Sequence, residues 1–234
     1  MRVASLIFAS IFIAHYAFAQ IAIKGEMVYT MAGDPIENGV VLIKDGKIER
    51  VGTAQRVSIP DNYEVFEAAV VTPGLIDAHT VVGLAGYLNQ DDDQDQLETS
   101  NAIQPELRAI DAYNAQEPLV GHLRSLGITT IHTGHGPGAL ISGQTMIVKT
   151  SGETVNDEVL NPSKMLAFTM GANLDRDFRK PGTRAKGVAM LRQELIKAQE
   201  YLEKRNGENP PAKNLKMDAL ADLLEGKFTA LVTV

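Results

Sequence analysis

Residues 73–81 read Pro-Gly-Leu-Ile-Asp-Ala-His-Thr-Val, and this stretch decides how the chain is interpreted. A short apolar strand runs into a polar end that carries Asp77 and His79. Side chains at positions i and i+2 of a strand face the same way, so two histidines at this spacing can bind one metal ion. Here the first position is His79 and the second is Val81. The stretch therefore predicts a metal-binding scaffold whose metal site is altered or lost.

The composition narrows the class of protein. The chain has 234 residues, of which 44% are hydrophobic and 22% are charged, as is typical of a globular protein with a real core. The net charge of -7 argues against a nucleic-acid partner, which requires a basic surface. The absence of cysteine excludes disulfides, thiolate zinc sites and a cysteine nucleophile. Any metal ion would therefore be bound by His, Asp, Glu or a modified Lys.

Residues 1–19 have the pattern of a signal peptide. Arg2 supplies the positive start, residues 3–14 are largely apolar, and Ala17-Phe18-Ala19 is a small-x-small cleavage site. The alternative is a membrane anchor, for which the apolar run is short. We expect cleavage after Ala19, no membrane span beyond it, and export to the periplasm or the medium.

Residues 20–69 are expected to form a small β-structured domain. Asp45-Gly46 separates the apolar-patterned runs 39–44 and 47–51, and Asp-Gly between such runs is a strong β-hairpin signal because both turn residues need positive φ. About 50 residues make a marginal core by themselves. We therefore predict a small antiparallel sheet that needs partner strands.

Residues 70–234 alternate between expected strands and helices, which favours a parallel α/β sheet or barrel. In the helix expected over residues 183–204, one face is predicted to carry Val188, Leu191, Leu195 and Ile196. The predicted elements are a buried strand 70–77, a helix 117–126 ended by Gly127, a strand 128–132, a glycine-rich loop 134–138, a strand 144–149, helices 183–204 and 217–224, and a last strand 228–234.

The length of this region is too small for a closed barrel. An eight-stranded (β/α) barrel takes about 250 residues, whereas residues 70–234 supply about 165. The chain also stops on an apolar strand that would normally be covered on both sides. We therefore expect an incomplete TIM-like barrel and a truncated chain or fragment.

The sequence resembles the amidohydrolase superfamily, and within it the secreted imidazolonepropionase-like branch. Residues 71–79 are similar to the family's first barrel strand, and residues 39–48 to its N-terminal β-sandwich. The similarity continues through the remaining chain. The further matching stretches are 103–112, 143–150, 186–204 and 224–227. The resemblance implies a β-sandwich segment over residues 20–69 and the N-terminal part of a barrel over residues 70–234.

The resemblance implies a hydrolase with one or two divalent metal ions, such as zinc. The metal-activated water would attack a carbon–nitrogen bond of a small amide, a cyclic amide or a dipeptide-like substrate. His79 matches the first metal-binding histidine of the family, but Val81 replaces the second. Thr233 stands where the family has a metal-binding residue, and the later ligands would lie beyond Val234. The resemblance thus implies the scaffold and only part of the ligand set.

Three histidines at expected strand ends are the candidate metal ligands. His79 ends the first strand, His132 ends the next one, and His135 lies in the glycine-rich loop after it. In a parallel barrel these residues would lie at the carboxyl-terminal face, where active sites gather. We therefore hypothesise a rearranged metal site of these three residues. The alternatives are a hydrogen-bonded strand-end residue for His79 and a flexible glycine loop around His135, because one imidazole falls short of the ligands that zinc needs.

The other polar residues have simpler interpretations. Asp77 lies two residues before His79 on the same strand face, so it can orient the histidine from outside the metal's own ligands or cap a turn. The acidic run 91–95 is expected to be a solvated loop, and Lys149 a surface residue. Residues 134–138 lack the Lys-Ser/Thr ending of a phosphate loop. No catalytic residue can be assigned.

Two further interpretations stay open beside the hydrolase. The Val81 and Thr233 replacements favour a non-catalytic member of the family that binds a ligand or a partner. The exposed end of a half barrel would require a partner subunit or a second copy to cover it. A gene fragment without a stable fold is the third.

Overall fold

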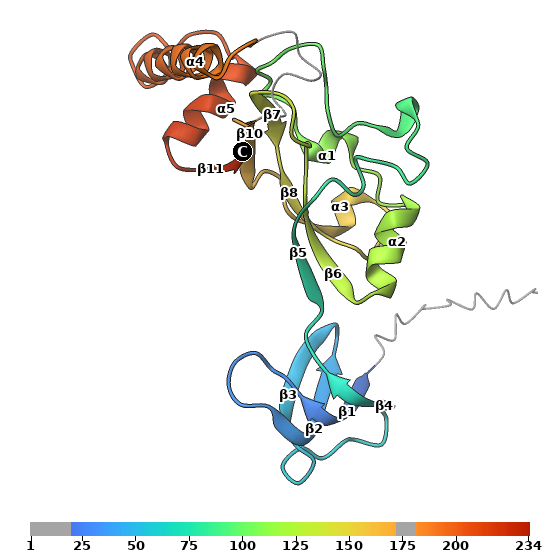
Figure 1. Ribbon diagram of the computed structural model, residues 1–234. Coiled ribbons are helices and arrows are strands. Elements are labelled where there is room, and N and C mark those ends of the chain that lie inside the picture. Colours follow the sequence, from blue (N-terminus) through green and yellow to red (C-terminus); the bar gives the residue numbers. More distant parts are fainter. Residues whose placement is uncertain (1–19, 172–180) are drawn as a thin grey trace, which may run out of the picture. The chain divides into compact units, whose positions relative to one another are not determined.

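The computed structural model describes residues 20–171 and 181–234 (Figure 1). The expected signal peptide, residues 1–19, lies outside them. The chain divides into two compact units, of which the first ends at Pro73 and the second runs from Gly74 to Val234. Among the described residues, none of the helices combines the length and apolar character that a bilayer span requires.

The first unit is built on one four-stranded sheet with the strand order β3-β2-β1-β4. Strands β1 with β2 and β2 with β3 pair antiparallel, but β1 and β4 run parallel. The expected all-antiparallel sheet is therefore wrong at β4, because the connection 54–63 returns the chain to the start of β1 before β4 begins. The strands are β1 (Ile21–Val28), β2 (Ile36–Lys44), β3 (Lys47–Thr53) and β4 (Glu64–Val71).

The predicted hairpin of this unit is confirmed. Asp45 and Gly46 connect β2 to β3 and have φ values of 51° and 72°, which are the left-handed conformations that a tight hairpin turn requires. A small core lies beneath the sheet, and apolar side chains on β4 such as Phe66 and Val70 are exposed. The described residues 20–73 thus form a single sheet rather than two facing sheets.

The second unit is a mixed α/β structure with two sheets, in the orders β5-β6-β8-β9 and β11-β10-β7. The pairs β5/β6 and β10/β11 are parallel, and the remaining pairs are antiparallel. The expected α/β class is confirmed, but the described strands do not close into a barrel. The strands are β5 (Leu75–Thr80), β6 (Ile128–Thr133), β7 (Ile141–Gln144), β8 (Met146–Lys149), β9 (Val159–Asn161), β10 (Met165–Thr169) and β11 (Thr229–Thr233).

Two expected strands are broken in the structure. The predicted buried strand 70–77 is interrupted at residues 72–74, so that its halves belong to β4 and β5, and Ile76 is 70% exposed. Pro73 has no N–H to donate to a sheet, which explains the interruption. The predicted strand 144–149 is split at Thr145, whose N–H donates to the Met165 carbonyl at 2.8 Å instead of continuing β8.

The helices begin and end at strong sequence signals. In α2, the Glu117 carboxylate accepts from the Leu119 N–H, Pro118 is the first helical residue, and Gly127 follows the end with φ of 83°. The expected helix 117–126 is thereby confirmed. The helical elements are η1 (Asp91–Asp93), α1 (Ala109–Ala112), α2 (Pro118–Ser125), α3 (Val155–Glu158), α4 (Arg184–Arg205) and α5 (Leu215–Leu224).

Helices α4 and α5 match the two expected C-terminal helices. Leu191 of α4 is buried, as expected, and Leu195 packs against the core. Val188 and Ile196 are 39% and 43% exposed, so the expected apolar face is wrong at these two positions. The buried residues of α4 are Gly187, Leu191 and Ala198, and the latter two belong to the same apolar cluster as Leu220 of α5.

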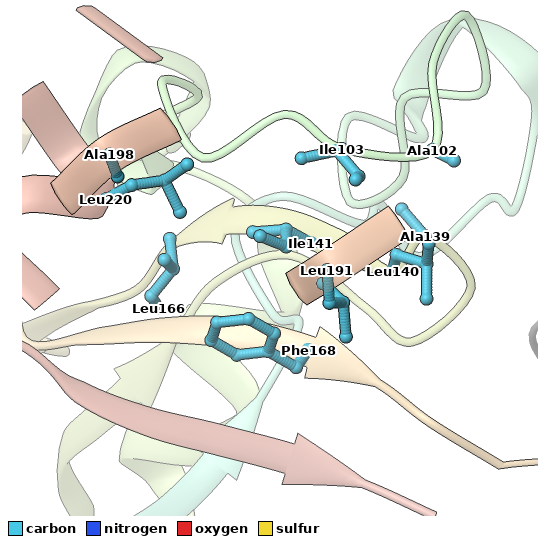
Figure 2. Packing of buried hydrophobic residues seen from close by; sticks show 10 residues of the cluster. All are labelled: Ala102, Ile103, Ala139, Leu140, Ile141, Leu166, Phe168, Leu191, Ala198 and Leu220. Atoms are coloured by element: carbon cyan, nitrogen blue, oxygen red, sulfur yellow. The ribbon is translucent and has the colours of Figure 1, made fainter. Parts of the chain in front are cut away.

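Two apolar clusters hold the second unit together. The first, shown in Figure 2, joins strands β7 and β10 to helices α4 and α5, with Ile141, Leu166, Leu191 and Leu220 among its members. The second joins β6 and β8 to α2, with Ile131 and Val148 fully buried. The end of β6 and the loop 134–138 lie between elements of these two clusters, and this region carries the predicted site residues.

Candidate functional site

His79 and Asp77 lie near the end of β5. Asp77 is half-buried and His79 is exposed. The backbone N–H of His79 donates to Oδ1 of Asp77 at 3.1 Å, so the carboxylate caps the strand end. Partial burial and the neighbouring His132 lower the pKa of His79, and the charge of Asp77 acts in the opposite direction. The Asp77 carboxylate thus contacts the backbone of His79, and the two roles considered for it, orienting the histidine or capping a turn, stay predictions.

His132, near the end of β6, has a partner at each ring nitrogen. It is 6% exposed, and its Nδ1 lies 2.8 Å from the carbonyl oxygen of Ala78. A carbonyl only accepts, so Nδ1 carries the proton. Nε2 lies 2.6 Å from Oγ1 of Thr145, and in the neutral tautomer it accepts the proton of that hydroxyl. The ring therefore holds β5, β6 and the β7–β8 junction together.

Thr145 is the residue that sequence reasoning missed. It is fully buried, and its Oγ1 also accepts from the Met165 N–H at 3.1 Å. The hydroxyl thus connects His132 to the start of β10. Thr145 ends the polar stretch 142–145 and precedes the apolar run 146–148, and this change of pattern was the available signal of a junction within the expected strand 144–149.

The structure brings two of the three predicted histidines together. The ring centroids of His79 and His132 are 5.8 Å apart, with the ring planes tilted by 52°. This proximity follows from the parallel pairing of β5 with β6, which places both strand ends at one edge of the sheet.

His135 lies in a different environment. It is 5% exposed, and neither ring nitrogen has a hydrogen-bond partner. The ring packs so closely on Gly143 that a Cβ there would collide with it. Burial lowers the pKa of His135 to about 4, although the Asp95 carboxylate and the Gln96 backbone act in the opposite direction. The predicted glycine-rich loop 134–138 is present, but most of it is buried.

The fold is similar to that of a solved amidohydrolase from Thermotoga maritima MSB8. The TM-score is 0.81 and the sequence identity is 25%, over 91% of this chain and 57% of that one. This chain has an amidohydrolase-like fold. The amidohydrolase-like chain spans little more than half the length of that structure. An ochratoxinase from A. niger also matches, with 26% identity over 31% of this chain and 18% of its own. Its TM-score of 0.26 is too low to indicate a shared fold. No protein-family model and no curated protein matches the chain.

A metal ion is expected in an amidohydrolase, and the described residues do not fit one. Within residues 20–171 and 181–234, no three His, Asp or Glu side chains gather closely enough to hold a metal ion. Both nitrogens of His132 are engaged, and Val81 offers no donor atom. Thr233, on β11, offers only a hydroxyl. The metal role of His79, His132 and His135 therefore stays a prediction, and His135 does not join the other two.

The remaining candidates of the amidohydrolase-like chain have local roles. The acidic run folds into η1, where the Asp93 carboxylate accepts from the Gln90 N–H at 2.9 Å and from Nε2 of Gln94 at 2.6 Å. Asp91 and Asp92 are exposed, and Asp93 is half-buried. Lys149 is half-buried at the end of β8. None of these residues provides an evident nucleophile or general base.

Proposed function

We propose that the chain is part of a hydrolase of the amidohydrolase type that acts on carbon–nitrogen bonds of small amides, cyclic amides or dipeptide-like molecules. The observation that carries the proposal is the match to the T. maritima amidohydrolase over 91% of the chain. A divalent, zinc-like metal would supply an activated water when bound. Of the candidates at the neighbouring strand ends, His79 is exposed whereas His132 is engaged at both ring nitrogens, so the other ligands would have to come from elsewhere.

We further propose that the second unit is part of a barrel. We assign β5, β6, β10 and β11 as the first four strands of an incomplete TIM-like barrel. The parallel pairs β5/β6 and β10/β11 support this assignment. Strands β5 and β11 are the outer strands of their sheets, and Leu75, Ile76 and Val232 on them are exposed. Further strands, from a partner subunit or a second copy, would cover these edges.

Export is part of the same proposal. The pattern of residues 1–19 supports a cleavable signal peptide and a protein that works in the periplasm or outside the cell. The lack of cysteine is compatible with either location.

The second candidate is a non-catalytic amidohydrolase-like protein that binds a ligand or a partner. The specific observation in its favour is His132, whose two nitrogens stabilise the fold at the position where a metal-dependent site would need free donors. The replacements at Val81 and Thr233 point the same way.

The test compares the chain as it stands with the product that includes any coding sequence following Val234. Both are purified with zinc and assayed for the new amino groups that form when cyclic amides are opened or when N-acyl amino acids and dipeptides are cleaved. The hydrolase proposal predicts zinc-dependent formation of amino groups by the longer product, abolished in His79→Ala and unchanged in His122→Ala, an exposed histidine on α2. A longer product that binds no zinc and forms no amino groups would support the non-catalytic candidate instead.

A further inference from the structure

Two residues that line one pocket carry unpartnered polar side-chain atoms. In the described part of the chain, four buried side-chain atoms lack a hydrogen-bond partner, and three of them belong to Glu106 and His135: Oε2 of the former and both ring nitrogens of the latter. Both residues line a pocket of about 280 Å³. Buried polar atoms are nearly always satisfied in folded proteins, so three orphans beside one cavity indicate a missing partner.

The pocket has a rigid frame. The Gly136 N–H donates to the Gln96 carbonyl at 2.7 Å, and the Gln144 N–H donates to the Leu107 carbonyl at 2.8 Å. These bonds tie the segments around Gln96 and Leu107 to the loop 134–138 and to β7. The walls are therefore fixed without help from a ligand, which reduces the entropic cost of binding.

The charge of the pocket favours a cation. Its lining includes the carboxylates of Asp95, Glu98, Glu106 and Asp111, against the single guanidinium of Arg108. Arg108 pairs loosely with Asp111, at 3.9 Å, so it leaves the other carboxylates unneutralised. A neutral imidazole at His135 adds one acceptor and one donor.

We propose that this pocket binds a small organic cation with N–H donors, such as an alkylammonium or an alkylguanidinium. Glu106 pairs with the positive charge, and His135 accepts one of the N–H groups. A metal ion is the poorer occupant, since the described carboxylates and imidazoles form no group of three that could hold one. The pocket lies near the lower end of the volumes that enclose small ligands. This inference does not depend on the proposed hydrolase.

The experiment titrates the full chain with methylguanidinium and follows the imidazole signals by proton–nitrogen NMR. His135→Gln assigns the signal of His135. We expect its resonances to shift saturably, and N-methylurea, the neutral molecule of the same shape, to cause a much smaller shift. Glu106→Gln should weaken binding by about tenfold or more, the usual cost of losing one charge-assisted hydrogen bond. Glu208→Gln, an exposed control after α4, should leave it unchanged.

Three outcomes would overturn the proposal. They are no saturable shift of His135 with methylguanidinium, an equal shift with N-methylurea, or unchanged binding in a folded Glu106→Gln. Each would mean that water satisfies the orphan atoms. The comparison of the two small molecules uses the unmodified chain, so it decides the question even if Glu106→Gln fails to fold.

Discussion

At the scale of single residues, His132 and His135 are two buried histidines with opposite circumstances. His132 has a hydrogen-bond partner at each nitrogen, whereas His135 has none. The net contribution of a hydrogen bond to folding stability is modest. A buried polar group left without a partner lowers that stability by about 1–3 kcal/mol. His132 is therefore expected to serve stability, and His135 to be the residue with unused binding capacity.

Thr145→Val tests the structural role of His132. The substitution keeps the shape of the side chain and removes the hydroxyl that serves Nε2 of His132 and the Met165 N–H. We expect the free energy of unfolding in urea to fall by about 1–3 kcal/mol. Thr229→Val, at an exposed position of β11, is the control and should change it little. Equal effects of the two substitutions would contradict the role given to His132.

His135 predicts a pH dependence of stability. Burial lowers the pKa of His135 to about 4 in the folded chain, against an ordinary value of 6.5. The unfolded chain therefore binds more protons between these values, and stability falls as the pH falls from 6.5 toward 4, by up to about 3 kcal/mol. In His135→Asn this part of the slope should disappear, as measured by urea unfolding at several pH values. His122→Asn should keep it; if both variants keep it, the burial argument fails.

The residue scale also sets the limit of sequence reasoning. The positions of His79 and His132 near the ends of neighbouring strands were predicted, because an apolar run precedes each of them. The hydrogen bond between Thr145 and the ring of His132 was not predicted. This contact joins residues far apart in the chain, and it depends on the junction between β7 and β8, where the expected continuous strand is wrong.

At the scale of elements, turns and helix ends were predicted correctly from local residues. The prediction that two apolar runs form continuous strands was wrong. The Asp45-Gly46 hairpin and the capped helix α2 are encoded by their own residues, and both were predicted. The breaks at residues 72–74 and at Thr145 were missed, since apolar runs do not reveal which sheet a strand will join. The parallel pairing of β4 with β1 was missed for the same reason.

One glycine within α2 and one just after it should respond in opposite ways to substitution by alanine, as measured by the stability of the chain. Gly121 lies inside the helix with open space around its Cα, so Gly121→Ala should stabilise the chain by about 0.5–1 kcal/mol. Gly127 follows the helix with φ of 83°, so Gly127→Ala should destabilise it by about 1 kcal/mol, although its surroundings are equally open. Urea unfolding measures both. The same sign for both substitutions would contradict the described end of α2.

At the scale of the whole molecule, the open edges of the sheets are expected to promote self-association. Leu75 and Ile76 of β5 are 59% and 70% exposed on an outer strand, and such an edge promotes association. We expect Ile76→Lys to lower the self-association of the chain in sedimentation. Leu126→Lys, at an exposed apolar residue after α2, should not. Equal self-association in the two variants would show that the β5 edge is not the contact.

The amidohydrolase-like fold was predicted from motifs, whereas the surroundings of His132 and His135 were not. The stretch 73–81 and its flanking elements identified the scaffold, which the T. maritima structure confirms. The loop 134–138 does lie beside the end of β5, where the Gly134 N–H donates to the Thr80 carbonyl at 3.3 Å, but the ring of His135 packs against Gly143 of β7 instead of joining His79 and His132.

The described residues form an amidohydrolase-like fold, and we infer that they do not by themselves make a complete metal site. The most direct test of this inference is the metal content of the purified chain after equilibration with zinc and removal of free metal. We expect far less than one zinc per chain, with the same value in His79→Ala. One tightly bound zinc per chain that is lost in His79→Ala would contradict the inference.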